Sequence, residues 1–317
     1  MKLRTVLSLF DGISCGQVAL QRAEIEFENY FASEIDKYAI QITQKNFPNT
    51  IQLGDVNNWQ EWNIDWNSVD LIIGGSPCQG FSVAGKQLNF NDHRSKLFFV
   101  YVDILNHIKQ INPNVKFLLE NVKMKKEFSE AISEILNCKP VEINSALVSA
   151  QNRKRLYWTN IGEIQQPEDK EIYLKDILEN GFVDREKSLC VTSTYFKGGN
   201  LQHYFEKHKR QVVFNSPLQV GIADIKGMDC IKRVYDIRGK APTLTTCGGG
   251  HREPKIAIGG VSWRKLTPIE CERLQTLSDN YTEGVSNTQR YKTLGNGWTV
   301  DVITHILKYL KQGEKNK

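Results

Sequence analysis

The sequence predicts an α/β protein whose larger domain is a doubly wound, mostly parallel β-sheet. Three observations lead to this prediction. Short strand patterns alternate with amphipathic helix patterns over the first 160 residues. Most of these strand patterns are apolar throughout, as in strands covered on both faces, and the alternation stops after about residue 164. Because ligands bind at the carboxyl ends of the strands in such sheets, candidate site residues are expected there.

The first half of this domain contains three strand patterns and two helix patterns. The apolar run "TVLSLF" (5–10) ends in the glycine turn "DGISCG", and "GQVALQRA" (16–23) then has helical spacing. "NYFASEI" (29–35) is a strand, and "KYAIQITQKN" (37–46) is a helix that stops before a proline. The short run "TIQLGDV" (50–56) is expected to be the third strand.

The second half continues the alternation. "VDLIIGG" (69–75) is a branched apolar strand, and "SKLFFVYVDILNHIKQI" (95–111) has helical apolar spacing. "VKFLLENV" (115–122) is a strand and "EFSEAISEIL" (127–136) a helix. Two more strands are expected in "PVEINSALV" and "RLYWTNI".

The chain is expected to divide into three segments. Residues 1–164 form the domain that carries the site, and 165–260 form a smaller, irregular, β-leaning domain rich in glycine, lysine, asparagine and aromatic residues. Residues 261–317 return to strong helical patterns, in "RKLTPIECERLQTL" and "WTVDVITHILKYL", and are expected to rejoin the first domain.

Composition excludes several classes of protein. The seven cysteines are an odd number without a C-x-x-C pair, which argues against a disulfide framework and against a zinc site, so no metal is expected. The longest apolar runs are strand-sized, and the N-terminus has no leader pattern, so we expect a soluble cytoplasmic protein. The net charge of +5 weakly favours an anionic partner, and a chance imbalance of surface charge is the open alternative.

Polar or reactive residues follow five successive strand patterns. They are Asp11 in the first turn, Glu34, Asp55, Cys78 and Glu120. The turn lacks the G-x-G-x-x-G spacing of a pyrophosphate binder, and its aspartate is a poor neighbour for phosphate, which disfavours a nicotinamide dehydrogenase. An acid about twenty residues further on is placed to hold ribose hydroxyls. This set favours an adenosyl cofactor without phosphates, S-adenosylmethionine, over the alternative of helix capping and turn chemistry.

Six motifs in order resemble those of the cytosine-C5 DNA methyltransferases. "LSLFDGISCG" resembles the family's cofactor loop, "GGSPCQGFS" its nucleophile loop, "LLENV" its Glu-Asn-Val motif and "QNRKR" its Gln-x-Arg-x-Arg motif. "RKLTPIECERLQTL" and "LGNGWTV" resemble its two closing motifs. The resemblance covers the first 160 and the last 55 residues, and it implies an S-adenosylmethionine-dependent methyltransferase sheet with 165–260 as the target-recognition domain.

The resemblance also explains why a strand would deliver one cysteine to a glycine-flanked turn. Cytosine C5 is too weak a nucleophile to take a methyl group unaided, whereas addition of the Cys78 thiolate at C6 makes C5 carbanion-like. The family gives Glu120 the role of stabilising this addition product through cytosine N3. It implies that Arg153 and Arg155 contact the base oxygen and a nearby phosphate; a solvated basic turn is the alternative for these two.

The expected binding residues follow from the same motifs. Those expected to hold S-adenosylmethionine are Phe10, Asp11, Gly12, Ile13, Ser14, Glu34, Ile35, Asp55, Val56, Pro77, Leu97, Asn296 and Trp298. Those expected to contact DNA are Ser76, Gln79, Ser82, Thr243 and Leu244. Trp298 departs from the Gly-Asn-Ser-Val of many bacterial members and resembles the de novo branch; it is expected to pack on the cofactor or, alternatively, at a helix start.

The expected function is methyl transfer from S-adenosylmethionine to C5 of a flipped cytosine in a specific double-stranded DNA sequence, by a monomeric bacterial or phage enzyme of a restriction-modification system. Two alternatives remain. A tRNA cytosine-C5 methyltransferase shares the chemistry, but Ser76 stands where that branch has proline and no Cys-Phe-Thr motif occurs. A catalytically inert DNA-binding homologue is disfavoured by the intact Cys78, Glu120 and Arg155.

Overall fold

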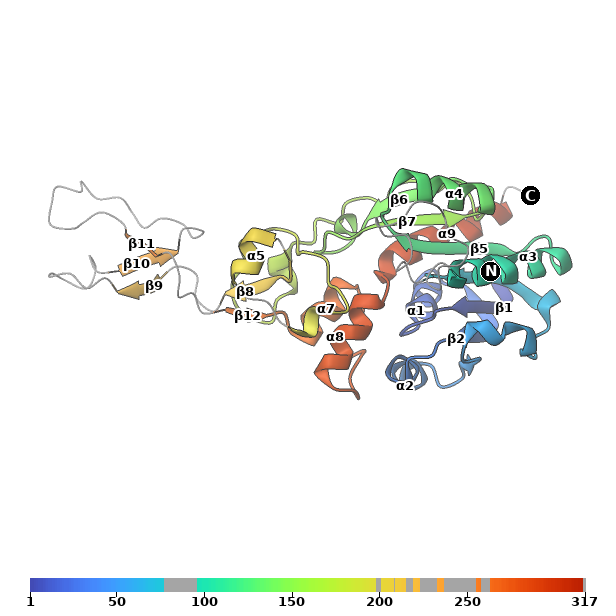
Figure 1. Cartoon of the computed structure of the whole chain (residues 1–317), viewed down its shortest axis with the longest axis horizontal. Coiled ribbons are helices and arrows are strands. Elements are labelled where there is room, and N and C mark those ends of the chain that lie inside the picture. Colours follow the sequence, from blue (N-terminus) through green and yellow to red (C-terminus); the bar gives the residue numbers. More distant parts are fainter. Residues whose placement is uncertain are drawn as a thin grey trace.

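A seven-stranded sheet forms the centre of the larger part of the molecule (Figure 1). The structure is a computed structural model that describes residues 1–76, 96–197, 201–207, 209–214, 219–222, 233–236, 255–257 and 263–315. The strand order is β3-β2-β1-β4-β5-β7-β6. The strands are β1 (Lys2–Leu9), β2 (Glu26–Ser33), β3 (Ile51–Gln52), β4 (Val69–Gly74), β5 (Lys116–Val122), β6 (Val141–Asn144) and β7 (Lys154–Thr159).

The first five strands run parallel, and the chain winds outward in both directions from β1. The order reverses between β1 and β4, which is the point where open α/β sheets bind ligands at the carboxyl ends of their strands. The prediction of a doubly wound, mostly parallel sheet is therefore confirmed.

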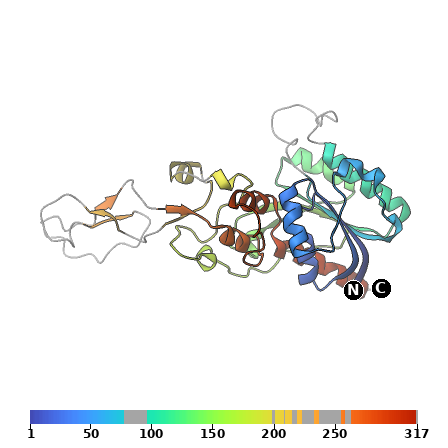
Figure 2. The same ribbon diagram turned by 90° about the horizontal axis from the view of Figure 1, so that it is seen from below.

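Helices cover both faces of this sheet, and each face has its own apolar core (Figure 2). Neighbouring residues of β4 show the division, because Leu71 and Ile73 belong to one core and Ile72 to the other. One core includes α1 (Cys15–Arg22), α2 (Lys37–Asn46) and α9 (Val300–Lys315). The other includes α3 (Lys96–Ile111), α4 (Lys126–Leu136) and the 3₁₀ helices η1 (Val56–Glu61) and η2 (Trp66–Ser68). Continuous apolar runs are what a two-sided burial requires.

The third strand is much shorter than expected. The sequence predicts a strand over 50–56, whereas β3 has two residues and the chain then turns at Gly54, whose φ is +73°. Asp55 ends the extended stretch because its side chain accepts a hydrogen bond from the Asn57 N–H, which caps η1. Similarly, the strand expected over 140–148 gives way to η3 (Ser145–Leu147), which Asn144 caps.

The direction of β7 was not given by its apolar pattern. β7 runs antiparallel to both β5 and β6. Arg155, at the start of β7, therefore lies opposite Val122, at the end of β5. This places the beginning of one strand on the same edge of the sheet as the carboxyl ends of the parallel strands.

The middle of the chain forms short elements outside the large sheet. They are η4 (Leu174–Ile177), η5 (Tyr195–Lys197), α5 (Leu201–Lys207), β8 (Val212–Phe214), β9 (Gln219–Ile222), β10 (Arg233–Asp236), β11 (Lys255–Ala257) and β12 (Trp263–Lys265). They include a three-stranded sheet, β11-β10-β9, and a two-stranded sheet, β12-β8. Figure 1 shows both small sheets beyond the large one along the long axis of the molecule. The exact boundaries 165 and 260 remain a prediction.

The C-terminal segment packs against the N-terminal helices. It contains α7 (Pro268–Leu274), α8 (Asn287–Asn296) and α9. The Tyr281 hydroxyl donates to the Ile13 carbonyl (2.7 Å), and Arg22 of α1 pairs with Asp301 of α9 (2.6 Å). Among the described residues, no helix combines the length and the apolar character needed to cross a membrane, and no cluster of metal-ligating side chains occurs.

Candidate active site

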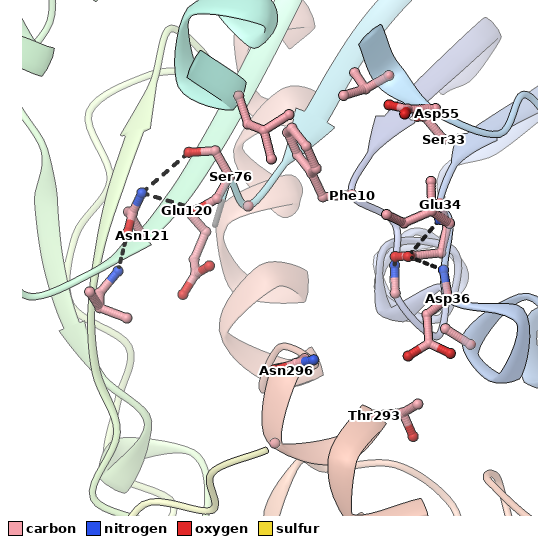
Figure 3. Close-up of a pocket in the computed structure, with 18 of the residues that line it drawn as sticks. Phe10, Ser33, Glu34, Asp36, Asp55, Ser76, Glu120, Asn121, Thr293 and Asn296 are labelled. Carbon is pink, nitrogen blue, oxygen red and sulfur yellow. Dashed lines mark hydrogen bonds between the residues drawn. The ribbon is translucent and has the colours of Figure 1, made fainter. Parts of the chain in front are cut away.

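A cavity of about 460 Å³ lies at the carboxyl edge of the parallel strands (Figure 3). Segments that follow β1, β2, β3, β4 and β5 line it, together with the end of α8 and the start of β7. Its lining residues are Phe10, Gly12, Ser33, Glu34, Ile35, Asp36, Ala39, Gly54, Asp55, Val56, Asn57, Gly75, Ser76, Leu97, Glu120, Asn121, Val122, Arg153, Arg155, Thr293, Gly295 and Asn296. The volume is in the range of small-molecule sites.

The turn after β1 has an unusual backbone. Phe10, Gly12 and Ser14 have φ values of 58°, 60° and 57°, in the left-handed region that only glycine adopts without strain. Phe10 and Gly12 line the cavity. Asp11, Ile13 and Ser14, which the sequence also assigns to the cofactor, are not among the lining residues; Ile13 is fully buried in the core instead.

Glu34 is held rigidly by main-chain groups. Its Oε2 accepts a hydrogen bond from the Gly12 N–H, and its Oε1 accepts from the N–H groups of Ile35 and Asp36, each at 2.8 Å. A carboxylate accepts about four hydrogen bonds, so Glu34 keeps one acceptor direction for a ligand hydroxyl. The neighbouring Ile35 is 75 % exposed at the cavity, which leaves an apolar face open to a ligand.

Both polar and apolar side chains line the cavity wall opposite Glu34. Asp55 lines the cavity beside Val56, and Leu97 adds an apolar side chain from α3. The Asp55 Oδ1 accepts from the Asn57 amide side chain at 2.7 Å, so Asp55 caps a helix and faces the cavity at once. The capping interpretation and the binding interpretation are therefore compatible for this residue.

Asp11 lies partly buried behind the turn. Its carboxylate accepts hydrogen bonds from Ser14 Oγ (2.5 Å) and from the Tyr30 hydroxyl (2.8 Å). Burial raises the pKa of Asp11 to about 6, although these hydroxyl groups act in the opposite direction. Desolvation of a charge that has no cationic partner explains this result.

Replacing Asp11 by asparagine is expected to stabilise the ligand-free protein at pH 7.5. The folded-state pKa of about 6 lies above the ordinary value of 3.8, so the native state loses stability as the pH rises from about 4 to 6. Asp11→Asn removes this loss, so the free energy of unfolding at pH 7.5 should rise by on the order of 2 kcal/mol. Urea denaturation of the variant and the wild type at pH 7.5 and at pH 5 measures the difference in unfolding free energy. This difference is expected to be smaller at pH 5. Asp103→Asn, on an exposed surface of α3, is the control. A less stable Asp11→Asn at pH 7.5 would contradict the prediction.

The other end of the cavity carries an ion pair. Glu120 Oε1 lies 2.9 Å from Nε of Arg155, and Glu120 Oε2 accepts a hydrogen bond from the Trp298 indole N–H at 3.2 Å. Figure 3 shows Glu120, Asn121 and Ser76 together on one side of the cavity, across from Glu34 and Asp36. The Asn121 amide donates to the carbonyl and the hydroxyl of Ser76, both at 3.3 Å. Asn121 thus fixes the last described residue after β4.

Arg153 and Arg155 occupy different environments. Arg153 is 4 % exposed, and its Nη1 and Nη2 donate to the carbonyls of Val191 (3.0 Å) and Gly297 (2.9 Å). Those groups also contact the Cys190 sulfur and the Gly295 carbonyl. Arg153 therefore joins the segment after residue 188 to the closing motif, although it also lines the cavity. Arg155 is the arginine that reaches Glu120.

Gly295 shows how tightly these segments meet. A Cβ atom at this position would lie 2.1 Å from the Ser193 nitrogen and from the Thr192 carbonyl carbon. No side chain fits there, since both neighbours are main-chain atoms. The glycine of "LGNGWTV" is needed for this contact, and Asn296 beside it lines the cavity.

Several lining residues were missed by sequence reasoning. Asp36 and Ser33 flank Glu34, so the strand-end argument extends to them. Gly75, which comes directly after β4, is packed between Glu120 and Trp298. Thr293 faces the cavity from α8, and a helical period back from Asn296 is the only signal in the sequence for it.

Some predicted residues lie outside the described part of the chain. These are Pro77, Cys78, Gln79, Ser82, Thr243 and Leu244. Ser76, the DNA-contact candidate that the structure describes, is 4 % exposed and lines the cavity. Trp298 is not among the cavity-lining residues, and its indole faces Glu120.

The chain matches one protein family over nearly its whole length. The family model described as C-5 cytosine-specific DNA methylase matches residues 4–312. The chain is 28% identical to the orphan methyltransferase M.SPBetaI of Bacillus phage SPbeta, over 100% of this chain and 99% of that protein. It is 29% identical to the type II methyltransferase M.HhaI of Haemophilus parahaemolyticus, over 95% of this chain and 92% of that protein.

Among solved structures, the Entamoeba histolytica methyltransferase EhMeth is similar in fold. The match has a TM-score of 0.65 and covers 99% of both chains, at 18% sequence identity. It supports the same arrangement of sheet and helices over the whole length of the chain.

Proposed function

Because the chain belongs to the C-5 cytosine-specific DNA methylase family and is a DNA methyltransferase, we propose that it transfers a methyl group from S-adenosylmethionine to C5 of a cytosine flipped out of duplex DNA. One observation carries the proposal. A single cavity extends from the Glu34 carboxylate, suited to a nucleoside, to the Glu120–Arg155 pair, suited to a base. Donor and acceptor would therefore share one cavity, which favours direct transfer.

The residues at the Glu34 end suit the adenosyl part of the cofactor. Glu34 would accept a hydrogen bond from a ribose hydroxyl, and Asp55 from the adenine amino group. Ile35, Val56, Leu97 and the strained Phe10 offer apolar surfaces for the ring. When bound, S-adenosylmethionine supplies a methyl group as a sulfonium electrophile.

The chain's part in the chemistry is to make C5 nucleophilic. We propose that the Cys78 thiolate adds to C6 of the cytosine and that the C5–C6 electron pair moves toward C5, which can then accept a methyl group. A base then removes the C5 proton, and the electron pair of that bond reforms C5–C6 as the thiolate leaves. A glycine on either side of the cysteine segment lets the backbone come close to the base.

Glu120 and Arg155 would stabilise the adduct. Cytosine N3 is an acceptor, so a proton must lie between N3 and the Glu120 carboxyl group for the two to interact. The Arg155 guanidinium, 2.9 Å from Glu120, orients that carboxyl group. Arg153 would act by holding the closing motif in place, since its guanidinium already donates to main-chain carbonyls.

A base inside a duplex is out of reach of this edge of the sheet, so the cytosine must be flipped out, at a cost of a few kcal/mol. We propose that 165–260 is the target-recognition domain and that Ser76, Gln79, Ser82, Thr243 and Leu244 contact DNA around the flipped nucleotide. The named relatives include type II and orphan methyltransferases. A role in DNA modification, by a monomer in the cytoplasm of a bacterial or phage-infected cell, follows by analogy.

Methyl-transfer assays test the proposal directly. Purified protein is incubated with S-adenosylmethionine carrying a labelled methyl group and with duplex DNA, and 5-methylcytosine is mapped by bisulfite sequencing. Label in duplex DNA at a recurring sequence is expected. Label in tRNA alone would favour a tRNA methyltransferase, and DNA binding without any label would indicate an inert homologue.

A further inference from the structure

We infer that Trp298 is a positioning residue of the catalytic carboxyl group, acting through its indole N–H on Oε2 of Glu120. The inference rests on the proposed function and adds a component to it. The sequence assigns Trp298 to the cofactor, but it is absent from the cavity lining and its Nε1 lies 3.2 Å from Glu120 Oε2. Arg155 occupies the other oxygen at 2.9 Å. The carboxyl group is therefore held at both oxygens by groups from two different segments.

The main chain around Trp298 is fixed on both sides, so the indole is aimed rather than free. The Gly297 carbonyl accepts from Nη2 of Arg153 at 2.9 Å and from the Gln275 amide at 3.3 Å. On the other side, Thr299 Oγ1 accepts a hydrogen bond from Ser145 Oγ and donates one to Gln275 Oε1, both at 2.9 Å. A side chain whose neighbours are anchored this way needs little further ordering to hold its donor in place.

The packing beside the contact excludes any larger residue. A Cβ atom at position 75 would lie 2.9 Å from Glu120 Oε2 and 3.0 Å from Trp298 Nε1. Gly75, the residue after β4, thus leaves room for the indole and the carboxyl group to come into contact. The glycine at position 75 is therefore required by this contact.

The contact matters because it controls where the shared proton lies. Two donors favour the carboxylate form of Glu120 and so favour the proton on cytosine N3, which withdraws electrons from the ring and assists thiolate addition at C6. Removing one donor lets the carboxyl group retain the proton. The positioning is thus also an electronic effect on the base.

In the part of the chain that the structure describes, the charged and titratable groups near Glu120 are two arginines and a tyrosine. Among the described residues, Arg155 and Arg153 are cationic and line the same cavity. Tyr157 lies opposite Glu120 in the β5–β7 pairing, and burial raises its pKa above the ordinary value, so it stays neutral. Because Tyr157 stays neutral, it does not add a charge beside the Glu120 carboxyl group.

Trp298→Phe tests the inference, since it keeps an aromatic ring and removes the donor. We expect the single-turnover methylation rate to fall about tenfold. The fall is expected in the rate at saturating S-adenosylmethionine and DNA, because the indole acts on the chemical step. S-adenosylmethionine affinity, measured by calorimetry, should stay unchanged. Trp66→Phe, whose ring packs on Trp59 and His107, is the matched control.

Two further variants keep the test decisive. In a double-mutant cycle, Trp298→Phe should add no further loss to Glu120→Gln if it acts through Glu120. Gly75→Ala, whose added Cβ would push the same two groups apart, should reproduce the fall in the methylation rate even where Trp298→Phe folds poorly. Weaker cofactor binding with an unchanged methylation rate at saturating cofactor, or no change at all, would overturn the inference. A wild-type protein that methylates no DNA would instead overturn the proposed function.

Discussion

Cys78→Ser is expected to abolish methyl transfer while leaving DNA binding intact. Serine preserves the size of the side chain, but a hydroxyl group is a far weaker nucleophile than a thiolate at neutral pH, so addition at cytosine C6 should be lost. Single-turnover methylation with a duplex that contains the target sequence is the measurement. Wild-type-like activity of the serine variant would exclude covalent catalysis by this residue.

A trapping experiment provides the positive control. Duplex DNA with 5-fluorocytosine at the target position blocks loss of the C5 substituent, so the wild type should remain attached to the DNA in a denaturing gel. The serine variant should form no such adduct, although a mobility-shift assay should show that it binds the same duplex. Cys138→Ser, a substitution at a half-buried cysteine after α4, should leave adduct formation unaffected.

Glu120→Gln is expected to lower kcat by roughly 10²- to 10⁴-fold, the range for loss of a general acid–base group. Glutamine keeps the shape and can still face Arg155, but it cannot share an acidic proton with cytosine N3. Because the side chain is 9 % exposed and paired, the amide also leaves Arg155 without its anionic partner. Thermal denaturation should accompany the kinetics, so that a loss of stability is not mistaken for a loss of chemistry.

Glu142→Gln serves as the matched control for this substitution. Glu142 pairs with Lys123 at the protein surface, 2.9 Å apart, near the same edge of the sheet. An exposed pair of this kind contributes little to stability, so the control should keep normal rates. Equal rates for Glu120→Gln and the control would contradict the role proposed for Glu120.

Much of the large sheet could be predicted because two-sided burial leaves a strong record in the sequence. The runs that became β1, β4 and β5 are continuous and apolar, and each boundary lies within a few residues of its prediction. The strand-end argument then brought Glu34, Asp55 and Glu120 into one cavity. The direction of a strand could not be predicted, because an apolar run has the same pattern in parallel and antiparallel strands. The antiparallel direction of β7, and with it the position of Arg155, is therefore known only from the structure.

The individual contacts of the site were less predictable. Arg153 and Arg155 are two residues apart in one motif, yet one is built into the interior and the other pairs with Glu120. Arg153 precedes β7 and Arg155 lies in it, and the spacing within the motif does not reveal where the strand begins. The partners of Arg153 lie some 40 and 140 residues further along the chain, in Val191 and Gly297. The partner of the Trp298 indole, Glu120, is likewise set by the fold, and the assignment of Trp298 to the cofactor remains a prediction.

The pairing of β8 with β12 has a consequence for how such proteins diversify. Val212 lies opposite Lys265 and Phe214 opposite Trp263, so the chain leaves and re-enters the two-stranded sheet at adjacent points. The two ends of the stretch between these strands, which contains β9, β10 and β11, are thus held together by the pairing of β8 with β12. Doubling the length of a flexible loop costs only about 0.6 kcal/mol of closure entropy. Lineages can therefore lengthen, shorten or exchange this stretch with little effect on the frame that holds Glu34 and Glu120.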